Sequence, residues 1–343
     1  MLVETVFFFL AASTVLYVLF AGADFGTGIL ATFKGKLLKE EQRVLIRQAV
    51  GPIWISSLVW LLLSVTILIV GFPAAYDVGS VIFRIPLILV ILGVTLRCWA
   101  FALQRYQLTG KADQHADQIF VLSSFLTPFM FGVLAGSAYL GDWPSAGDSF
   151  FDLYIRPWAS ATSLLSGLFA CSIFALIASV YLIGETQSPP LRHHFYIRVK
   201  WFAISSSVTG SGVILSAHFS GASIIAEIFA EPGTMPALYM AFFLFRYLFK
   251  ALKRQRMRFA RFTVASQVSL VFLVWLQVQL PAIIISRLEP DRTITIYSAA
   301  AAESTLNVIA QVVPIALIIV VPTLFYFLGP FQRSHKTERS TSV

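Results

Sequence analysis

One carboxylate lies well inside an apolar stretch near the start of the sequence, where an ionisable group is costly. Asp24 belongs to the segment AGADFGTG at residues 21–28, between Gly22 and Gly26. Glycines four residues apart share one face of a helix and let a second helix approach closely. A carboxylate beside such a contact must be neutral, paired or hydrogen-bonded. Asp24 is therefore a candidate proton-pathway or helix-locking acid, and the alternative is a structural carboxylate bonded to neighbouring backbone or hydroxyl groups.

A single arginine, Arg97, lies inside another apolar stretch, in the segment LRCWAF at residues 96–101. It is a candidate partner for Asp24, because both residues lie toward the same end of their stretches. The alternative is that its long side chain snorkels to the lipid headgroups. Arg84 and Arg246 lie near the ends of their stretches, and we expect both to snorkel.

Ligands for a redox cofactor are scarce in this sequence. Haem requires axial His, Met, Cys or Tyr ligands at protected positions, but only His218 of the five histidines falls near an apolar stretch, at its end. The tandem His193-His194 has no other ligand type nearby. Cys98 and Cys171 belong to no CxxC or Cys/His cluster, and we expect them to be packing residues. The sequence also lacks a Walker-type phosphate loop, an HExxH motif and a Ser/His/Asp pattern.

Membrane-spanning helices must position these residues. The 343 residues are 57% hydrophobic and 12% charged, with a mean hydropathy of +0.80, whereas soluble domains carry about 25% charged residues. This composition excludes a soluble enzyme, a secreted disulfide scaffold and a nucleic-acid-binding domain, despite the net charge of +8. A span needs about 20 apolar residues. Apolar stretches predict nine spans, at residues 4–31, 52–72, 80–102, 117–140, 158–183, 200–218, 235–252, 260–286 and 304–328.

The distribution of charge predicts the orientation of these spans. Most of the 25 Lys and Arg residues fall in the odd-numbered connections and the C-terminal tail, whereas acidic residues favour the other side. Because basic residues concentrate on the cytoplasmic side, we expect the N-terminus outside and the C-terminus in the cytoplasm. We expect one transmembrane domain over residues 1–330 and a disordered cytoplasmic tail over residues 331–343.

Two connecting segments have patterns of their own. Residues 37–50 mix apolar and charged side chains at helical spacing, which is typical of a helix lying along the cytoplasmic surface or of a solvated helical loop. Residues 220–236 are interrupted by Gly and Pro, which is compatible with a partly re-entrant external loop. A secondary transporter would carry buried charge at the midplane and matching broken helices in two halves. In this sequence midplane charge is almost absent, and nine spans do not divide evenly into two halves.

Several motifs resemble those of subunit II of cytochrome bd-type quinol oxidases. GADFGTG at residues 22–28 resembles the signature at the end of that family's first span. GPIW at residues 51–54, followed by VW at 59–60, resembles the entry to its second span, LRCWAF resembles its LRxxAF stretch, and TLNV at residues 305–308 resembles its closing segment. Besides Asp24 and Arg97, the positions matched to the family are Gly22, Gly26, Gly28, Trp54 and Asn307, for which we expect packing or hydrogen-bonding roles.

The resemblance implies an all-α fold of about nine transmembrane helices, arranged as two four-helix bundles plus a peripheral helix, in a bacterial cytoplasmic membrane. It implies a haem-bearing subunit I as the partner, which oxidises quinol and reduces oxygen to water. Membrane lipid, and in some complexes a structural quinone, would be further partners, and nucleic acid would not. This chain would be a non-catalytic subunit without a cofactor of its own. In some members subunit II is thought to carry a proton path, and Asp24 matches the acid of the family's first motif.

The sequence departs from the family in one place that bears on proton delivery. After GPxW the family usually has an acidic residue and an Asn-containing stretch, whereas this chain has ISSL at residues 55–58, whose hydroxyls cannot titrate in place of an acid. The complex would then take its protons elsewhere, or the chain would serve a relative of the standard oxidases. Two further interpretations stay open, namely a transporter-like protein that reuses the fold and a structural partner of a non-oxidase complex.

Overall fold

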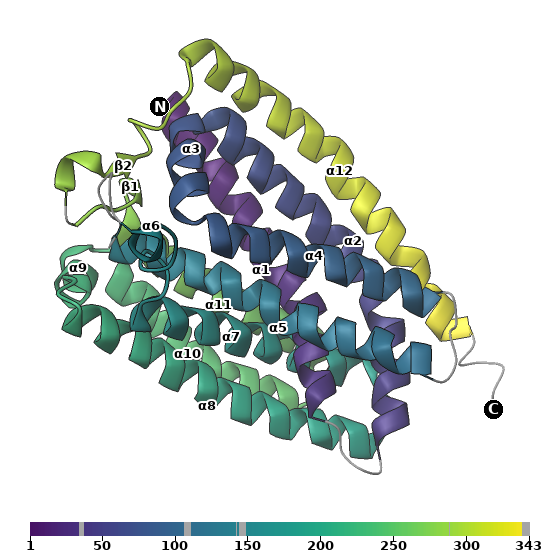
Figure 1. Ribbon diagram of the computed structural model, residues 1–343. Coiled ribbons are helices and arrows are strands. Elements are labelled where there is room, and N and C mark those ends of the chain that lie inside the picture. The colour runs from purple at the N-terminus through teal and green to yellow at the C-terminus, as the bar shows by residue number, and fades with distance from the viewer. Residues whose placement is uncertain (34–37, 106–110, 142, 144–148, 288, 338–343) are drawn as a thin grey trace.

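The computed structural model describes the chain except for residues 34–37, 106–110, 142, 144–148, 288 and 338–343, and except for the side chains at 52, 105, 111, 325 and 327–337. Helices dominate the described part (Figure 1). The elements are α1 (Leu2–Thr32), α2 (Lys39–Gly71), α3 (Pro73–Ile82), α4 (Arg84–Arg105), α5 (Lys111–Leu140), α6 (Phe150–Tyr154), α7 (Ala161–Glu185), α8 (Pro189–Phe219), α9 (Ile224–Ala230), α10 (Thr234–Lys253), α11 (Met257–Gln279), β1 (Ala282–Ile284), the 3₁₀ helix η1 (Pro290–Arg292), β2 (Ile294–Thr295) and α12 (Glu303–Thr337).

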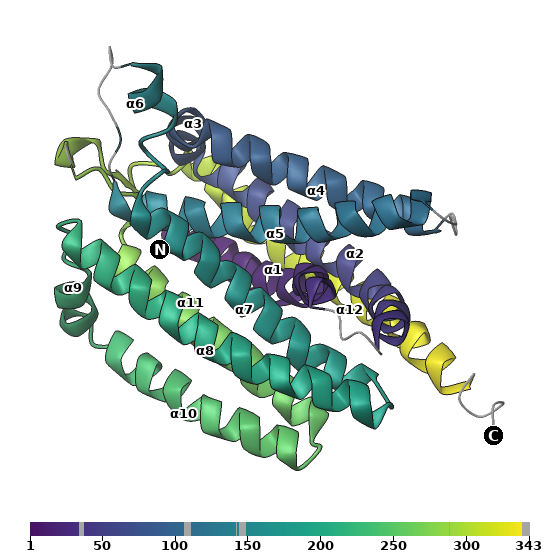
Figure 2. The ribbon, with the colours of Figure 1, turned by 60° about the horizontal axis from the view of Figure 1, so that its bottom comes forward.

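The long helices form two four-helix bundles and one peripheral helix. The first bundle consists of α1, α2, α4 and α5, and the second consists of α7, α8, α10 and α11. Both α1 and α5 pack against α7 and so join the two bundles, which Figure 2 shows from the side of α8 and α10. The remaining long helix, α12, lies along α1 and α2 at the edge of the first bundle (Figure 1). The predicted all-α architecture is therefore confirmed.

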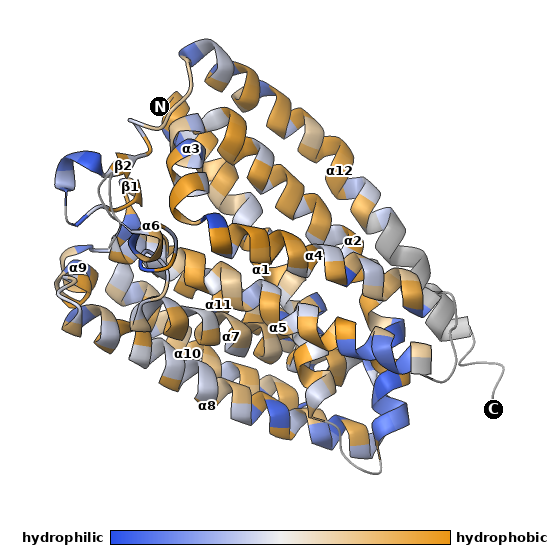
Figure 3. Ribbon diagram, viewed as in Figure 1, coloured by the Kyte–Doolittle hydropathy of each residue, from blue (hydrophilic) through white to orange (hydrophobic). Residues whose placement is uncertain are grey.

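Within the described residues, nine helices are long and apolar enough to span a membrane. They are α1, the segment Ile53–Gly71 of α2, α4, α5, α7, α8, α10, α11 and α12 up to Leu324. Hydrophobic residues fill the middle of these helices, and hydrophilic residues gather near one end, for example in the first turns of α2 (Figure 3). The chain is an integral membrane protein, and the predicted number of spans is confirmed for the part of the sequence that the structure covers.

The helix that contains the second span begins before the span itself. α2 runs without interruption from Lys39, whereas its membrane-spanning segment is Ile53–Gly71, close to the predicted residues 52–72. Ile46 and Val50 are only 4% and 1% exposed, in a core that also contains Leu30 of α1 and Phe120 of α5. The predicted helical character of this segment is therefore confirmed for residues 39–50. Its apolar residues recur at helical spacing because they pack against α1 and α5.

The eighth span ends earlier than the sequence predicts. α11 stops at Gln279, and the apolar residues that follow form β1, which pairs in antiparallel fashion with β2. Gln279 Nε2 donates to Ile283 O at 3.1 Å and to Ala138 O of α5 at 3.3 Å, which ties this turn to the first bundle. In the segment 220–236, residues Ile224–Ala230 form the short helix α9, which packs against α8, α10 and α11.

Candidate functional site

The side chains of Asp24 and Arg97 meet inside the first bundle. Asp24 lies on α1 and Arg97 on α4, and both side chains are 0% exposed. Arg97 Nη2 donates to Asp24 Oδ1 at 2.5 Å and to the backbone oxygen of Asp24 at 2.6 Å. Arg97 therefore faces the bundle interior and does not snorkel to the headgroups, which decides between the two alternatives that the sequence left open.

The other donors of Arg97 reach α5. Nη1 donates to Ser124 Oγ at 2.6 Å and to Phe120 O at 3.2 Å. The guanidinium carbon lies 3.8 Å from the ring centre of Phe120, and the ring centres of Phe25 and Phe101 lie at 4.9 and 5.2 Å. A desolvated arginine on an aromatic face gains about 2 kcal/mol from the cation–π attraction. One buried side chain thus ties α1, α4 and α5 together.

The pair leaves one carboxylate oxygen available. Asp24 Oδ2 is buried and has no hydrogen-bond partner among the described residues, and the same holds for Arg97 Nε. Buried polar atoms usually have a partner, because an unmade hydrogen bond costs about 1–3 kcal/mol or more for a charged group. Asp24 Oδ2 is therefore the position at which this site can accept a further hydrogen bond or a proton.

Glycines bring α1 close enough to its neighbours to form the site. A Cβ atom at Gly26 would lie 2.6 Å from the carbonyl carbon of Phe174 on α7, and a Cβ at Gly28 would lie 2.6 Å from the Cβ of Ser124 on α5. Real Cβ atoms do not approach other carbons this closely, so larger residues would push the helices apart. Gly22 also faces α7. The glycine spacing thus explains how Ser124 comes within reach of the arginine that holds Asp24.

Trp54 and Asn307, the other family-matched residues, have different surroundings. Trp54 on α2 is half-buried, and its ring centre lies 4.8 Å from that of Phe101. Because Phe101 also faces the Arg97 guanidinium, Trp54 supports one aromatic wall of the site. Asn307 lies on an exposed face of α12, where its Oδ1 accepts a hydrogen bond from Gln311 Nε2 at 3.2 Å. Asn307 is therefore not part of the site around Asp24 and Arg97.

Sequence reasoning missed an ion network between the first turns of α2 and α5. Arg43 contacts Asp113 at 2.5 Å and Asp117 at 2.7 Å, and Arg47 contacts the same two carboxylates at 2.6 and 2.8 Å. Partial burial acts to lower the pKa of Arg43, but the hydrogen bonds and charges of the two aspartates outweigh it and raise that pKa. The spacing of four residues within each pair places both members on one helix face, and this signal could have indicated the network.

A small cavity lies beside the ion network. Its volume is about 20 Å³, and its lining includes Gln42, Asp117 and Phe120. A polar cavity needs roughly 10–15 Å³ to hold one water molecule. Gln42 is 1% exposed, donates to Leu30 O at 3.0 Å and has no partner for its Oε1. Phe120, whose carbonyl accepts from Arg97, is the residue that this cavity shares with the site.

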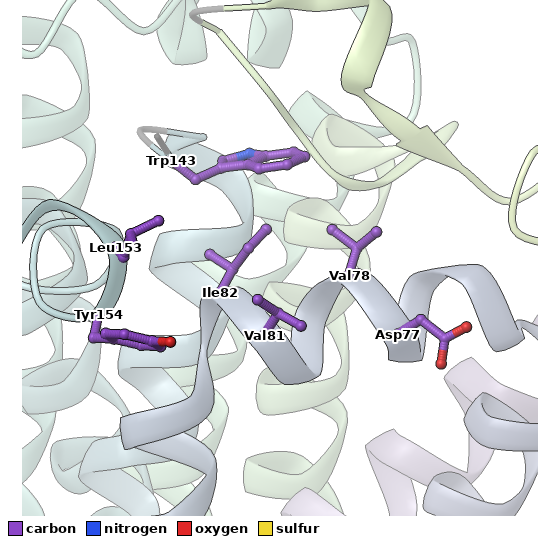
Figure 4. Close-up of a pocket in the computed structure, with 7 residues that line it drawn as sticks. All are labelled: Asp77, Val78, Val81, Ile82, Trp143, Leu153 and Tyr154. Atoms are coloured by element: carbon purple, nitrogen blue, oxygen red, sulfur yellow. The ribbon is translucent and has the colours of Figure 1, made fainter. Parts of the chain in front are cut away.

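A larger pocket, of about 420 Å³, lies beyond the other end of α2. In Figure 4 the carboxylate of Asp77 points away from the aromatic side chains of the lining. Ligand sites usually combine an apolar wall with a few convergent polar groups, and this lining is almost wholly apolar. The pocket therefore offers packing but no chemistry. It is lined by Asp77, Val78, Val81 and Ile82 of α3, by Leu153 and Tyr154 of α6, and by Trp143.

The described histidines lie outside the helix cores. His115, His193 and His218 are exposed, and His194 is half-buried beside the backbone oxygen of Phe33 at 3.3 Å. Within the described residues, no group of three or more His, Cys, Asp or Glu side chains is placed to hold a metal ion. Cys171 is buried, as the sequence predicted, and Cys98 is only partly buried.

Comparisons with known proteins give consistent results. The family profile of cytochrome bd terminal oxidase subunit II matches residues 2–331. The cytochrome bd ubiquinol oxidase subunit 2 of Bacillus subtilis (strain 168) is 30% identical over 152 residues, which make up 43% of this chain and 43% of that relative. The alignment thus spans less than half of the relative's length. The structure of bd oxidase from Geobacillus thermodenitrificans contains a chain that matches with a TM-score of 0.78 and 17% identity, over 96% of this chain and 98% of that one, which shows a shared fold.

Proposed function

Because the chain belongs to the family of subunit II of cytochrome bd terminal oxidases, we propose that it is the haem-free subunit of such an oxidase. Its partner would be a haem-bearing subunit I, which oxidises quinol and reduces oxygen to water. The proposed role of this chain is to complete and stabilise that heterodimer in the bacterial cytoplasmic membrane. The proposed orientation places the N-terminus outside and the C-terminus in the cytoplasm, because the basic connections then lie inside.

The donor set of the chain supports a haem-free role. Axial haem ligands must be held at protected positions, whereas His115, His193 and His218 are exposed at helix ends. The half-buried ring of His194 contacts a backbone oxygen. We therefore expect the haem ligands, and with them the redox chemistry, to belong to a partner subunit.

The observation that carries the stabilising role is the Asp24–Arg97 pair. Its side chains are 0% exposed, and Arg97 bridges α1, α4 and α5 through four hydrogen bonds. Removing one partner of a buried ion pair costs about 3–5 kcal/mol, because the remaining charge is left uncompensated. The pair would hold the helices of the first bundle in one packing arrangement. The bundle would then offer a rigid surface to which a partner subunit can bind.

A second candidate role is proton transfer through Asp24. Two observations favour it, namely the unpartnered Oδ2 of Asp24 and the cavity of about 20 Å³ lined by Gln42 and Asp117. Ile55 stands where the family has the acid after GPxW, and the buried hydroxyls of Ser56 and Ser57 beside it cannot titrate in its place. A proton route in this complex would therefore enter through the ion network of α2 and α5.

Purification of tagged chain from its native host tests the oxidase role. We expect a multi-span partner to co-purify, together with haem bands in reduced-minus-oxidised spectra and quinol-dependent oxygen consumption. A stable complex without haem bands would refute the proposal. Transport activity of the chain alone would support the transporter-like interpretation instead.

The substitution Asp24→Asn separates the two roles of the site. If the carboxylate is a structural lock, D24N lowers the yield of assembled complex, and the complexes that do assemble turn over normally. If it transfers protons, D24N assembles fully, but oxygen consumption falls while haem reduction by quinol stays intact. Ser57→Ala is a matched control, because Ser57 is buried in the same bundle and its hydroxyl donates to Trp54 O of its own helix at 2.8 Å. We expect S57A to change neither measurement.

A further inference from the structure

A run of exposed cations without acidic neighbours lies at one end of α10 and α11. No Asp or Glu occurs between Glu231 and Glu289 in the sequence. Within the described residues, none of the six cations forms an ion pair, and all six are exposed. In contrast, Arg261, one turn further along α11, pairs with Glu185 of α7 at 2.7 Å. We call the six the basic rim, and they are Arg246, Lys250, Lys253, Arg254, Arg256 and Arg258.

Three cations of the basic rim lie one above another on one face of α10. Residues Phe242, Arg246, Lys250 and Lys253 are spaced by four, four and three positions, so they lie on one face of the helix. All four are exposed, and Phe242 is 67% exposed. At a rise of about 1.5 Å per residue, the cations from Arg246 to Lys253 span roughly 10 Å along the membrane normal. The guanidinium of Arg246, which lies furthest from the end of α10, can extend toward the membrane surface and the other cations, as long cationic side chains do at membrane interfaces.

The start of α8 extends the same charged surface. Arg192 Nη1 donates to Gln255 Oε1 at 3.4 Å, which places the first turn of α8 beside the α10–α11 connection. α8 has 31 residues and is therefore about 46 Å long, whereas the hydrocarbon core is about 30 Å thick. The first turns of α8 thus extend beyond the hydrocarbon together with the basic rim, and they add exposed Lys200 and half-buried Arg198.

Large exposed aromatic side chains continue this surface toward the membrane interior. A soluble anion would leave these rings uncovered, whereas lipid hydrocarbon can cover aromatic rings at this depth without cost. Cations that alternate with aromatic rings, followed by further rings toward the membrane interior, match the headgroup and the upper acyl chain of a phospholipid. The rings belong to Phe243 and Tyr247 of α10, 52% and 51% exposed, and to Phe259 and Phe262 of α11, 49% and 69% exposed.

We propose that the basic rim and the adjoining aromatic residues bind anionic phospholipids, with the phosphates held by the six cations and the upper acyl chains on the rings. Clusters of four to eight Lys and Arg beside a membrane-spanning helix attract anionic lipid. The surface belongs to the second bundle, away from Asp24 and Arg97, so the proposal does not depend on the oxidase role. It predicts that this end of the second bundle selects lipids by charge.

Lipid selectivity in nanodiscs tests the proposal on the full chain in its purified complex. The nanodiscs contain phosphatidylcholine with a minor fraction of spin-labelled phosphatidylglycerol or spin-labelled phosphatidylcholine, and the immobilised fraction of each label is measured. We expect a clear preference for phosphatidylglycerol, and we expect K253Q/R254Q/R256Q to lower it by about tenfold. Equal immobilisation of the two labels by the unmodified protein would overturn the proposal, as would an unchanged preference in this variant.

Matched variants separate charge from fold. K253R/R254K/R256K keeps the three charges and is expected to keep the preference, whereas its loss would show that charge is not the cause. R156Q/R292Q removes cations at the other end of the helices, and we expect it to leave the preference intact. Displacement of the spin-labelled lipid by inorganic phosphate would show that the surface binds a soluble anion, and it would refute the proposed lipid binding.

A measurement on the unmodified protein covers the case in which the neutral variant does not assemble. Lys250 and Lys253 are exposed amines, so they react with a water-soluble acylating reagent unless lipid covers them. We expect slower acylation of both in phosphatidylglycerol nanodiscs than in phosphatidylcholine nanodiscs, with Lys39 as the exposed comparison. Equal rates in the two lipids would refute the proposal.

Discussion

Replacing Arg97 by glutamine removes the cation that balances Asp24, and we expect this change to destabilise the first bundle strongly. The variant leaves a carboxylate with 0% exposure uncompensated and removes the donors to Phe120 O and Ser124 Oγ. Breaking one side of a buried ion pair costs about 3–5 kcal/mol. The Phe120 ring, whose centre lies 3.8 Å from the guanidinium carbon, also loses its cation–π contact. We therefore expect the cost to lie in the upper half of that range.

A double-mutant cycle measures the part of this cost that belongs to the pair. D24N and R97Q are made singly and together, and unfolding of the purified protein in mixed micelles is followed by circular dichroism as denaturing detergent is added. Removing both charges leaves no uncompensated ion, so the double variant should cost at least about 2 kcal/mol less than the sum of the single variants.

A surface pair in the same protein is the control. Arg261 and Glu185 form a similar contact at 2.7 Å, but their side chains are 33% and 28% exposed. Solvent screening limits such pairs to about 1 kcal/mol, so the coupling measured by the same cycle with E185Q and R261Q should not exceed that. Additive costs in the Asp24–Arg97 cycle, or a coupling there as small as that of Glu185 and Arg261, would refute the reasoning.

Three further predictions concern residues around the site. Gly26→Ala should prevent assembly because its Cβ would collide with the α7 backbone, whereas Gly51→Ala, with nothing within 4 Å of its Cβ, should be neutral when yields of folded protein are compared. Arg43→Gln should cost about 1 kcal/mol at low salt and less in about 1 M salt, where the Debye length is ~3 Å; a salt-independent cost in micelle unfolding would contradict a screened network. Gln42→Leu should slow oxygen consumption without lowering assembly if protons pass the small cavity, and unchanged turnover would argue against that route.

The sequence indicated the two candidate side chains, Asp24 and Arg97, better than it indicated their contacts. Asp24 and Arg97 were identifiable because ionisable residues are rare in apolar stretches. Their pairing was left open, because hydropathy does not tell which face of the fourth helix meets α1. The rings of Phe120 and Phe25 around the guanidinium could not be predicted either, since phenylalanine is equally suited to lipid-facing and core positions.

The boundaries of the elements show where hydropathy misleads. Residues 39–50 carry charges, so a hydropathy pattern ends the span, although the helix continues into the aqueous phase as part of α2. Residues 282–284 are apolar, so the same pattern extends the eighth span, although they form β1. In both cases the polarity of a segment does not mark the end of its helix, because a helix can extend beyond its apolar span and a buried turn can be apolar.

The peripheral position of α12 has a consequence for biogenesis. Only 11% of its apolar window is buried within the chain, compared with 67% for α7. The Asp24–Arg97 pair, the glycine contacts and the ion network all lie in helices that precede it in the sequence. Both bundles can therefore close before α12 enters the membrane, and docking of this helix against α1 and α2 is then the last step in forming the fold.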